Sequence, residues 1–316
     1  MTTPGRSRLS LLIATTAGIL LVLEAVGRWA IPGPPTREDQ LVADVELGWA
    51  LPREPQMNWR GTLARINRLG LRGRTPLDDP QATRILVVGD SSVFGDGVRD
   101  SQTLPDQLAQ RLESRHQADV QNGGVPGYTC TQSTTLIARL TPDFQPDVLV
   151  SYNMHSDFRR ASPDDRVMTQ RKLGPLANTG VGRLIATGTL WMRIWRQRPN
   201  LEAPAYQTCL DAMVRTQTAT GGRMVLVIPF NESDFPQSAH YGMEEPDPPG
   251  TRLADYRTSM RQVAARSGSL LVDGPAVLLA SGLKKDEALQ DMVHPTARGH
   301  AVLAAAIDAA MWPSEE

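Results

Sequence analysis

Two short segments that lie far apart in the sequence carry side chains suited to acyl transfer. The first is the run Gly-Asp-Ser-Ser at 89–92, which contains Ser91. The second holds Asp291 and His294 three positions apart, followed directly by Pro295. A serine hydroxyl is a poor nucleophile until a base takes its proton, and the base needs a third group to orient it. Ser91, His294 and Asp291 can fill these three roles if the fold brings the two segments together.

The elements around these segments are those of an α/β protein. Short apolar runs rich in branched residues predict β-strands, and they alternate with stretches of helical periodicity. The predicted strands are 84–88, 118–122, 147–151, 223–229 and 269–272. The predicted helices are one that Thr103 caps and that carries Leu104, Leu108 and Leu112, and others over 204–218, 252–266 and 297–311. This alternation predicts a three-layer α/β/α sandwich with a central parallel sheet of about five strands. Ser91 would then lie at the carboxyl edge of the sheet, where α/β folds bind ligands.

The amino-terminal residues 1–31 predict a hydrophobic helix. From Leu9 to Ile31 the chain is long enough to cross the hydrocarbon layer of a membrane, which takes about 20 residues. No convincing small-residue cleavage site is present, so we expect an uncleaved anchor, with a cleaved signal peptide as the alternative. Arg6 and Arg8 precede the apolar run. They favour a cytoplasmic amino end, which places the rest of the chain outside the cytoplasm.

The remainder of the chain divides into a stalk and a domain. Residues 32–80 carry many prolines and few periodic apolar positions, so they predict a proline-rich stalk and lead-in. Residues 81–316 form the predicted domain, with a helical insertion at about 158–203. In this insertion Trp191 and Trp195 can share one helical face. It is either a peripheral helix packed on the domain or a segment that contacts the substrate or a membrane surface.

Composition argues against several kinds of partner. The net charge is −1 and the sequence pI about 6.5, so no strong positive field favours nucleic acid. Cys130 and Cys209 are too few for a disulfide framework or a metal knuckle. We expect two buried thiols, with one bridge in an oxidising compartment as the alternative. No spacing typical of metal ligands is present, so we expect neither a metal nor another cofactor.

Together these motifs resemble those of the SGNH, or GDSL-type, hydrolases. The resemblance comes from the run at 89–92, the Gly-Gly-Val-Pro-Gly run at 123–127, and Asp-x-x-His-Pro at 291–295. It covers residues 84–311 and implies the flavodoxin-like fold of that family. The segment Asn-x-x-Gly-Leu-Arg-Gly at 67–73, with the hydrophobic amino terminus, is similar to a membrane-anchored bacterial subgroup.

The resemblance implies a role for each residue of the site. Ser91 would be the nucleophile and His294 the general base, while Asp291 would hold the imidazole in its productive tautomer. The amide of Ser91 can serve as one oxyanion donor. Gly127 matches the family glycine whose amide is the second donor, and the absence of a β-carbon lets its backbone approach the developing charge.

The third oxyanion donor departs from the family pattern. The family has Gly-x-Asn-Asp after its third strand, whereas this chain has Ser-Tyr-Asn-Met-His-Ser-Asp at 151–157. Ungapped spacing puts Ser156 at the asparagine's position, and Asn153 can serve only if the loop is re-routed. We expect His155 to be an ordinary loop residue and Asp90 to support the turn.

The sequence as a whole predicts a membrane-anchored serine esterase that needs no cofactor. It would remove acyl groups, acetyl among them, from a small-molecule, glycan or lipid ester of the cell envelope through an acyl-serine intermediate. One alternative is an O-acyltransferase that uses the same residues and a sugar hydroxyl as acceptor. Another is a catalytically idle binding or scaffold protein. The departure at Ser156 favours the idle alternative, and the intact set of Ser91, Asp291 and His294 opposes it.

Overall fold

The fold is built around a parallel five-stranded sheet. The computed structural model describes residues 4–33, 41–53, 55–113, 115–162, 165–235 and 252–313. The strands of the sheet are β5 (Thr83–Gly89), β6 (Ala118–Gly124), β7 (Val148–Tyr152), β8 (Arg223–Ile228) and β9 (Leu270–Asp273). They lie in the order β6-β5-β7-β8-β9, and each adjacent pair is parallel. The predicted sheet is therefore confirmed.

The strand order creates a switch point between β5 and β7. The chain proceeds from β5 outward to β6, and then returns to the other side of β5 to add β7, β8 and β9. Gly89 at the end of β5 pairs with Gly124 of β6 and Tyr152 of β7. The three strands thus end at one level, and the loops that follow them meet at the carboxyl edge of the sheet. Doubly wound folds bind ligands at such a switch point.

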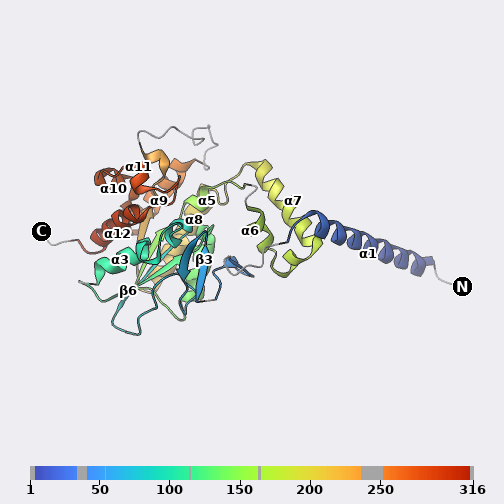
Figure 1. Cartoon of the computed structure of the whole chain (residues 1–316), viewed down its shortest axis with the longest axis horizontal. Coiled ribbons are helices and arrows are strands. Elements are labelled where there is room, and N and C mark those ends of the chain that lie inside the picture. Colours follow the sequence, from blue (N-terminus) through green and yellow to red (C-terminus); the bar gives the residue numbers. More distant parts are fainter. Residues whose placement is uncertain are drawn as a thin grey trace. The chain divides into compact units, whose positions relative to one another are not determined.

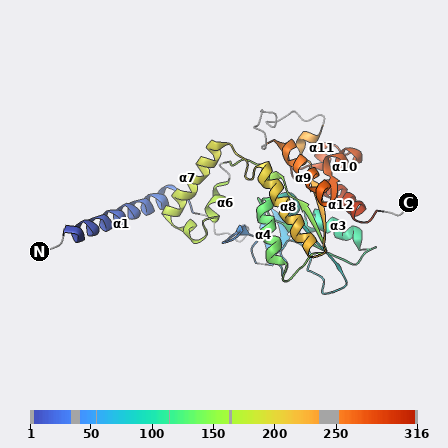
Figure 2. The ribbon, with the colours of Figure 1, turned by 180° about the vertical axis from the view of Figure 1, so that it is seen from behind.

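Helices cover both faces of the sheet, as the α/β/α prediction requires. One layer contains α3 (Leu104–Leu112), α10 (Gly274–Ser281) and α12 (Ala297–Met311), and the other contains α4 (Cys130–Leu140), α8 (Ala203–Ala219) and α9 (Leu253–Ser267). Figures 1 and 2 show the two layers from opposite sides. The predicted helices correspond to α3, α8, α9 and α12, whereas α4 and α10 were not predicted.

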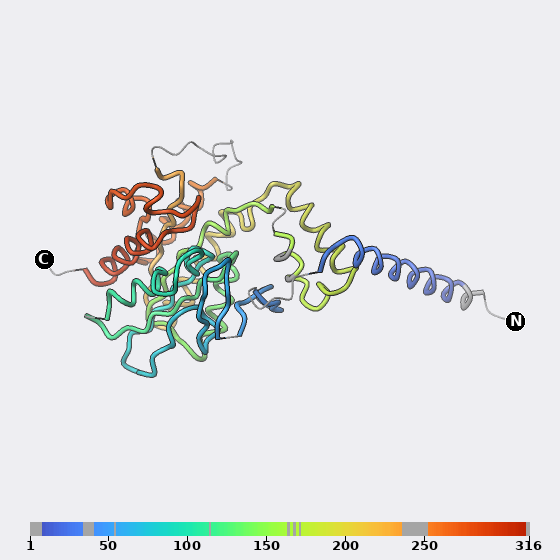
Figure 3. Tube along the Cα trace, in the orientation of Figure 1, coloured from blue at the N-terminus to red at the C-terminus, as the bar shows by residue number. Residues whose placement is uncertain are grey.

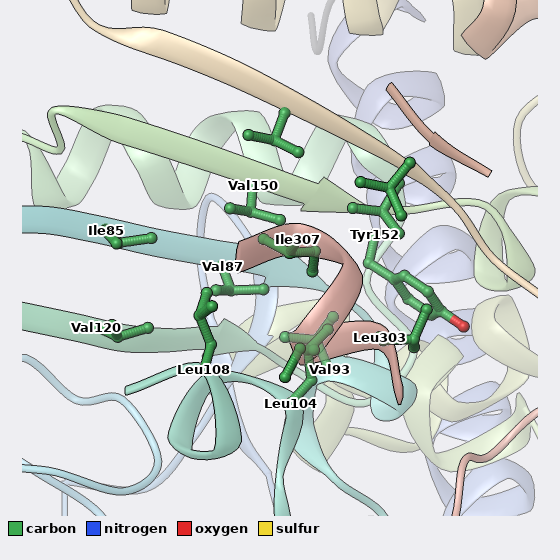
Figure 4. Close-up of a cluster of buried hydrophobic side chains, with 14 of the residues drawn as sticks. Ile85, Val87, Val93, Leu104, Leu108, Val120, Val150, Tyr152, Leu303 and Ile307 are labelled. Atoms are coloured by element: carbon green, nitrogen blue, oxygen red, sulfur yellow. The ribbon is translucent and has the colours of Figure 1, made fainter. Parts of the chain in front are cut away.

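The first layer encloses a core of buried apolar side chains, drawn in Figure 4. Val87 and Val150 point from β5 and β7 toward Leu108 of α3 and Ile307 of α12, and all four side chains are buried. Side chains alternate along a strand, so the next residue on each strand faces the opposite layer. Both faces of these strands are therefore apolar. The short helices α2 (Ser91–Phe94), α5 (His155–Phe158) and α11 (Lys285–Ala288) follow β5, β7 and α10 in the chain.

Residues 51–80, predicted as part of the stalk, belong to the same compact unit as the sheet. This unit, called unit 2, comprises residues 51–159 and 198–316 within the described part of the chain. The lead-in forms a hairpin of β3 (Gln56–Trp59) and β4 (Thr62–Arg65). Arg72 then bridges to Asn122 of β6, and its side chain is buried. Residues 34–40 of the predicted stalk lie outside the described residues.

The described residues of 4–33, 41–50 and 160–197 form the other compact unit, called unit 1. It contains α1 (Pro4–Ala30), the hairpin of β1 (Val42–Asp44) and β2 (Gly48–Ala50), α6 (Arg166–Arg171) and α7 (Gly180–Arg196). The segment Arg8–Ala30 of α1 has a mean hydropathy of 2.2 and is long enough to cross a membrane. α7 is the helix predicted in the insertion.

The excursion of the chain into unit 1 between α5 and α8 begins and ends at one place. The chain leaves unit 2 after Arg159 and returns at Arg198. Here the amide of Asn200 donates a hydrogen bond to the carbonyl of Arg159, at 3.0 Å. The amide of Leu201 donates to the carbonyl of Asp157, at 3.1 Å. Within unit 2, therefore, the two ends of the excursion are joined side by side.

A disulfide joins Cys130 at the start of α4 to Cys209 in α8. These two helices lie next to each other on one face of the sheet (Figure 2). The expectation of two separate thiols was wrong, because the two helices bring their cysteines within bonding distance. Disulfides persist mainly in oxidising compartments such as the periplasm or the cell exterior.

Candidate active site

The side chains of Ser91, His294 and Asp291 form a chain of hydrogen bonds. Ser91 begins α2 directly after β5, and its Oγ lies 2.8 Å from Nε2 of His294. Oδ2 of Asp291 lies 2.6 Å from Nδ1 of the same ring. When Nδ1 carries the proton and donates it to the carboxylate, Nε2 is left to accept the serine proton. The structure thus brings together the three residues to which the sequence assigns the chemistry.

The electrostatics of this group favour a charged imidazole during catalysis. Oδ1 of Asp291 accepts the amides of Val293 and His294, each at 2.9 Å. Burial raises the pKa of Asp291, but hydrogen bonds from the imidazole and these amides outweigh it and bring the pKa well below its usual value. Burial lowers the pKa of His294, but the hydrogen bond and charge of Asp291, together with Asp96, raise it above its ordinary value. Asp291 therefore remains ionised and stabilises the imidazolium.

Asp90 ties together the loops on either side of the switch point. Its side chain is buried, with Oδ1 accepting the amide of Ser92 and Oδ2 accepting the amide of Ser156, both at 2.9 Å. Asp90 therefore supports the turn, as expected. Both carboxylate oxygens are in use, and the described residues contain no group of three or more His, Cys, Asp or Glu side chains that could hold a metal ion.

The loop after β6, which contains Gly127, begins against the end of β5 and against α2. The amide of Val125 donates to the carbonyl of Gly89 at 3.2 Å, which joins this loop to the end of β5. Gly124 packs so closely that a Cβ there would lie 2.2 Å from the amide nitrogen of Phe94. Gly127 itself has a φ of +80°, which favours glycine. No hydrogen bond between described residues uses its amide, so Gly127 stays a candidate for the second oxyanion donor.

The two candidates for the third oxyanion donor have different surroundings. The side chain of Asn153 is buried, and its Nδ2 donates to Oγ of Ser133 on α4 at 2.9 Å. This amide therefore fastens the end of β7 to α4 and is not directed at a substrate. Ser156 is held through its amide by Asp90 and through its carbonyl by Nδ2 of Asn200 at 2.8 Å. No hydrogen bond to another described residue engages its hydroxyl, so Ser156 is the better placed candidate.

Sequence reasoning missed two buried residues, Ser92 and His155, that lie near the segment of His294. Oγ of Ser92 donates to the carbonyl of Val293 at 3.2 Å, next to His294 in the chain, and lies 3.5 Å from Nδ1 of His155. Burial lowers the pKa of His155 to about 4, so its ring is neutral at neutral pH. His155 is thus a packed part of the site and not an ordinary loop residue. Its position after the third predicted strand was the only signal available.

A second carboxylate lies beside the imidazole. Oδ2 of Asp96 is 3.8 Å from Nε2 of His294 and 3.2 Å from Nη1 of Arg60. Its negative charge contributes to the raised pKa of the histidine. The sequence around Asp96 indicates only a turn, but its carboxylate belongs to the electrostatic environment of His294.

Arg72 holds the loop that carries Asp96. Its buried guanidinium donates to the carbonyls of Phe94 at 3.0 Å, Gly95 at 2.8 Å and Val98 at 2.7 Å. Its Nε also donates to Oδ1 of Asp100 at 2.8 Å. One side chain from the lead-in thus satisfies three main-chain oxygens at the end of α2 and in the turn that follows it. The segment at 67–73 was the sequence signal for this arrangement.

A doubly wound parallel sheet with a hydrogen-bonded serine, histidine and aspartate at its switch point is an arrangement suited to serine-dependent acyl transfer. The chain matches the GDSL-like lipase/acylhydrolase family over residues 87–302. It belongs to this family and is an ester-bond hydrolase. No curated protein matches the sequence.

Several solved structures resemble this chain at low identity. LAE5, an alpha/beta hydrolase enzyme from the metagenome of Lake Arreo, is 21% identical over 72% of this chain and 94% of its own, with a TM-score of 0.48. A catalytic mutant of Axe2, an acetylxylan esterase from Geobacillus stearothermophilus, is 19% identical over 76% and 98%, with a TM-score of 0.48. The psychrotrophic esterase EstA from Pseudoalteromonas sp. is 14% identical over 72% and 96%, with a TM-score of 0.47.

Proposed function

We propose that this protein cleaves acyl esters through an acyl-serine intermediate. The observation that carries the proposal is the pair of hydrogen bonds that links Ser91 through His294 to Asp291, at 2.8 and 2.6 Å. A neutral serine becomes nucleophilic only with such a base in contact. The proposal is favoured over the idle alternative because the chain belongs to a family of lipases and acylhydrolases and keeps Ser91, His294 and Asp291 in hydrogen-bond contact.

In the proposed reaction, Oγ of Ser91 attacks the ester carbonyl carbon while Nε2 of His294 takes the hydroxyl proton. The amides of Ser91 and Gly127, with the hydroxyl of Ser156, donate to the oxyanion of the tetrahedral intermediate. The intermediate collapses, and the alcohol leaves with the proton from the imidazolium. A water molecule then gives its proton to His294 and attacks the acyl-serine, which releases the acid and restores Ser91.

We further propose that the enzyme is anchored in a membrane and acts outside the cytoplasm on an acyl ester of the envelope, with acetyl esters of carbohydrate or lipid as the first candidates. The apolar segment Arg8–Ala30 supports the anchor, and the disulfide between Cys130 and Cys209 supports an oxidising compartment. A reporter enzyme that is active only outside the cytoplasm, fused to the carboxyl end, tests the orientation. Activity of the same fusion only in lysed cells would contradict it.

Labelling with a fluorophosphonate tests the catalytic assignment in the full-length protein in detergent. We expect labelling and turnover of p-nitrophenyl acetate, both lost in Ser91→Ala. Ser101→Ala, at an exposed position in the same segment, is the matched control and should retain both. Labelling that persists in Ser91→Ala would refute the assignment of the nucleophile. If an acetyl donor and an oligosaccharide together yield acylated sugar instead of free acetate, the enzyme is an acyltransferase.

A further inference from the structure

In unit 1 the end of α1 and the start of α7 lie side by side (Figure 3), and a side chain from each helix caps the other. Oε2 of Glu24 on α1 accepts the amide of Val181 in the first turn of α7, at 3.0 Å. In return, Nη1 of Arg183 on α7 donates to the carbonyl of Ile31 just past the end of α1, at 3.0 Å. The first amides and last carbonyls of a helix lack partners within it and carry partial charges. The carboxylate of Glu24 therefore lies at the positive end of α7, and the guanidinium of Arg183 lies at the negative end of α1.

Two glycines let the helix backbones touch at this junction. A Cβ on Gly27 of α1 would lie 2.0 Å from the carbonyl oxygen of Gly180. A Cβ on Gly180 would lie 1.9 Å from the carbonyl oxygen of Glu24. No larger residue fits at either position without separating the helices. The end of α1 is thus an integral part of the fold of unit 1.

From this junction α7 presents an apolar face to solvent. Ile185, Trp191, Met192 and Trp195 are 50%, 61%, 56% and 82% exposed. Positions 185, 192 and 195 follow helical spacing, and position 191 lies at the edge of the same face. The buried residues of α7, such as Ala186 and Leu190, lie on its other side. Large exposed apolar faces mark surfaces that contact a partner or a membrane.

The charge and composition of α7 favour a lipid surface over a protein partner. The helix contains Arg183, Arg193 and Arg196 and no acidic residue. Trp29, at the end of the apolar segment of α1, is 89% exposed. Tryptophan is enriched at the level of the lipid headgroups, and arginine on interfacial helices binds anionic lipids. Because α7 starts where α1 ends, an inserted α1 places the start of α7 at that level.

We propose that α7 is an interfacial helix whose apolar face enters the headgroup region of the membrane that α1 crosses, with Arg193 and Arg196 bound to anionic lipid headgroups. The proposal depends on the anchoring by α1 proposed above. It also implies that α1 is retained, because cleavage would remove the carboxylate that caps α7. The hydrocarbon anchor and the surface helix would thus form one folded membrane-binding unit.

Quenching of tryptophan fluorescence by bromine-labelled lipids tests this proposal. The full-length protein is reconstituted into vesicles of brominated phosphatidylcholine and phosphatidylglycerol. Trp29→Phe reports the anchor, the double variant Trp191→Phe/Trp195→Phe reports α7, and Trp312→Phe is the control. Trp312 belongs to unit 2 and stacks on His116. We expect the first two variants each to lose a part of the quenched emission and the control to lose only unquenched emission.

The outcomes separate a failure of α7 from a failure of the anchor. If Trp29→Phe lowers the quenched emission and the double α7 variant does not, α7 lies away from the lipid and the proposal is overturned. If neither variant lowers it and the protein does not float with the vesicles, the anchoring fails as well. A dimer in detergent that Trp191→Ser/Trp195→Ser converts to a monomer would assign the face to a second copy and would equally overturn the proposal.

The arginines have a separate test in the same preparation. Arg193→Gln/Arg196→Gln should reduce the quenching of α7 in vesicles with phosphatidylglycerol to the level seen in phosphatidylcholine alone. Arg115→Gln/Arg223→Gln in unit 2 is the matched control with the same loss of charge and should leave the quenching unchanged. Equal quenching in the α7 variant and in this control would overturn the binding of anionic headgroups by α7.

Discussion

Replacing Arg72 by methionine tests how the lead-in supports the catalytic loop. The side chain is 1% exposed and donates to three carbonyls within 94–98 as well as to Asp100. Methionine keeps much of the volume but donates nothing. An unpartnered buried polar group costs about 1–3 kcal/mol, and breaking a buried ion pair costs about 3–5 kcal/mol. These costs do not simply add, because Asp100 keeps its bond to Arg65 and the freed carbonyls can turn toward water. We therefore expect a loss of about 3–5 kcal/mol in the free energy of unfolding.

Arg65→Met is the matched control, because Arg65 contacts the same carboxylate at 3.1 Å but is 64% exposed. An exposed pair contributes about 0–1 kcal/mol. Urea unfolding of unit 2 within the full chain, followed by circular dichroism and by loss of esterase activity, measures both variants. kcat should also fall in Arg72→Met, because the loop that carries Asp96 loses its support. A loss below about 1 kcal/mol, or equal losses in the two variants, would refute this reasoning.

Three further predictions concern the site and the disulfide. The pKa of His294 is raised, and the base must be unprotonated to act, so kcat/KM should rise with pH through a pKa above about 6.5. Asp291→Asn should shift this rise to lower pH and reduce kcat by about 10⁴-fold. Cys209→Ser opens a loop of 79 residues and should lower the free energy of unfolding by about 4 kcal/mol in urea titrations, and the untreated wild type should show no free thiol. Ser156→Ala should reduce kcat by about 10²–10³-fold, whereas Asn153→Ala should reduce stability and leave the kcat of the folded fraction unchanged.

Most of the sheet is predictable from the sequence because its signals are local. The residues of β5 between Ile85 and Val88 are apolar at every position, since both faces of the strand are covered. The helices α3 and α12 have apolar residues at helical spacing, and a capping threonine marks where each helix begins. The hairpin of β3 and β4 has neither signal. Its environment depends on contacts such as that of Arg65 with Asp100, which lies 35 positions further along the chain.

The catalytic residues are predictable from their types and spacing, but their supporting contacts are not. Ser91, Asp291 and His294 carry a recognisable chemistry wherever they occur. Ser92 and His155 gain their roles only when β7 comes to lie beside β5. The pairing of Cys130 with Cys209 likewise depends on two neighbouring helices, one of which was not predicted. Such long-range relations leave no local pattern in the sequence.

The hydrogen bond between the Asn200 amide and the Arg159 carbonyl has a consequence for how this architecture can change. For unit 2, the 38 residues from 160 to 197 are an insertion whose two ends are held together by this hydrogen bond. The entropy cost of closing such a loop rises only slowly with its length. Evolution can therefore shorten, lengthen or exchange this segment, or an engineer can replace it with a few glycines, without rebuilding the hydrolytic machinery.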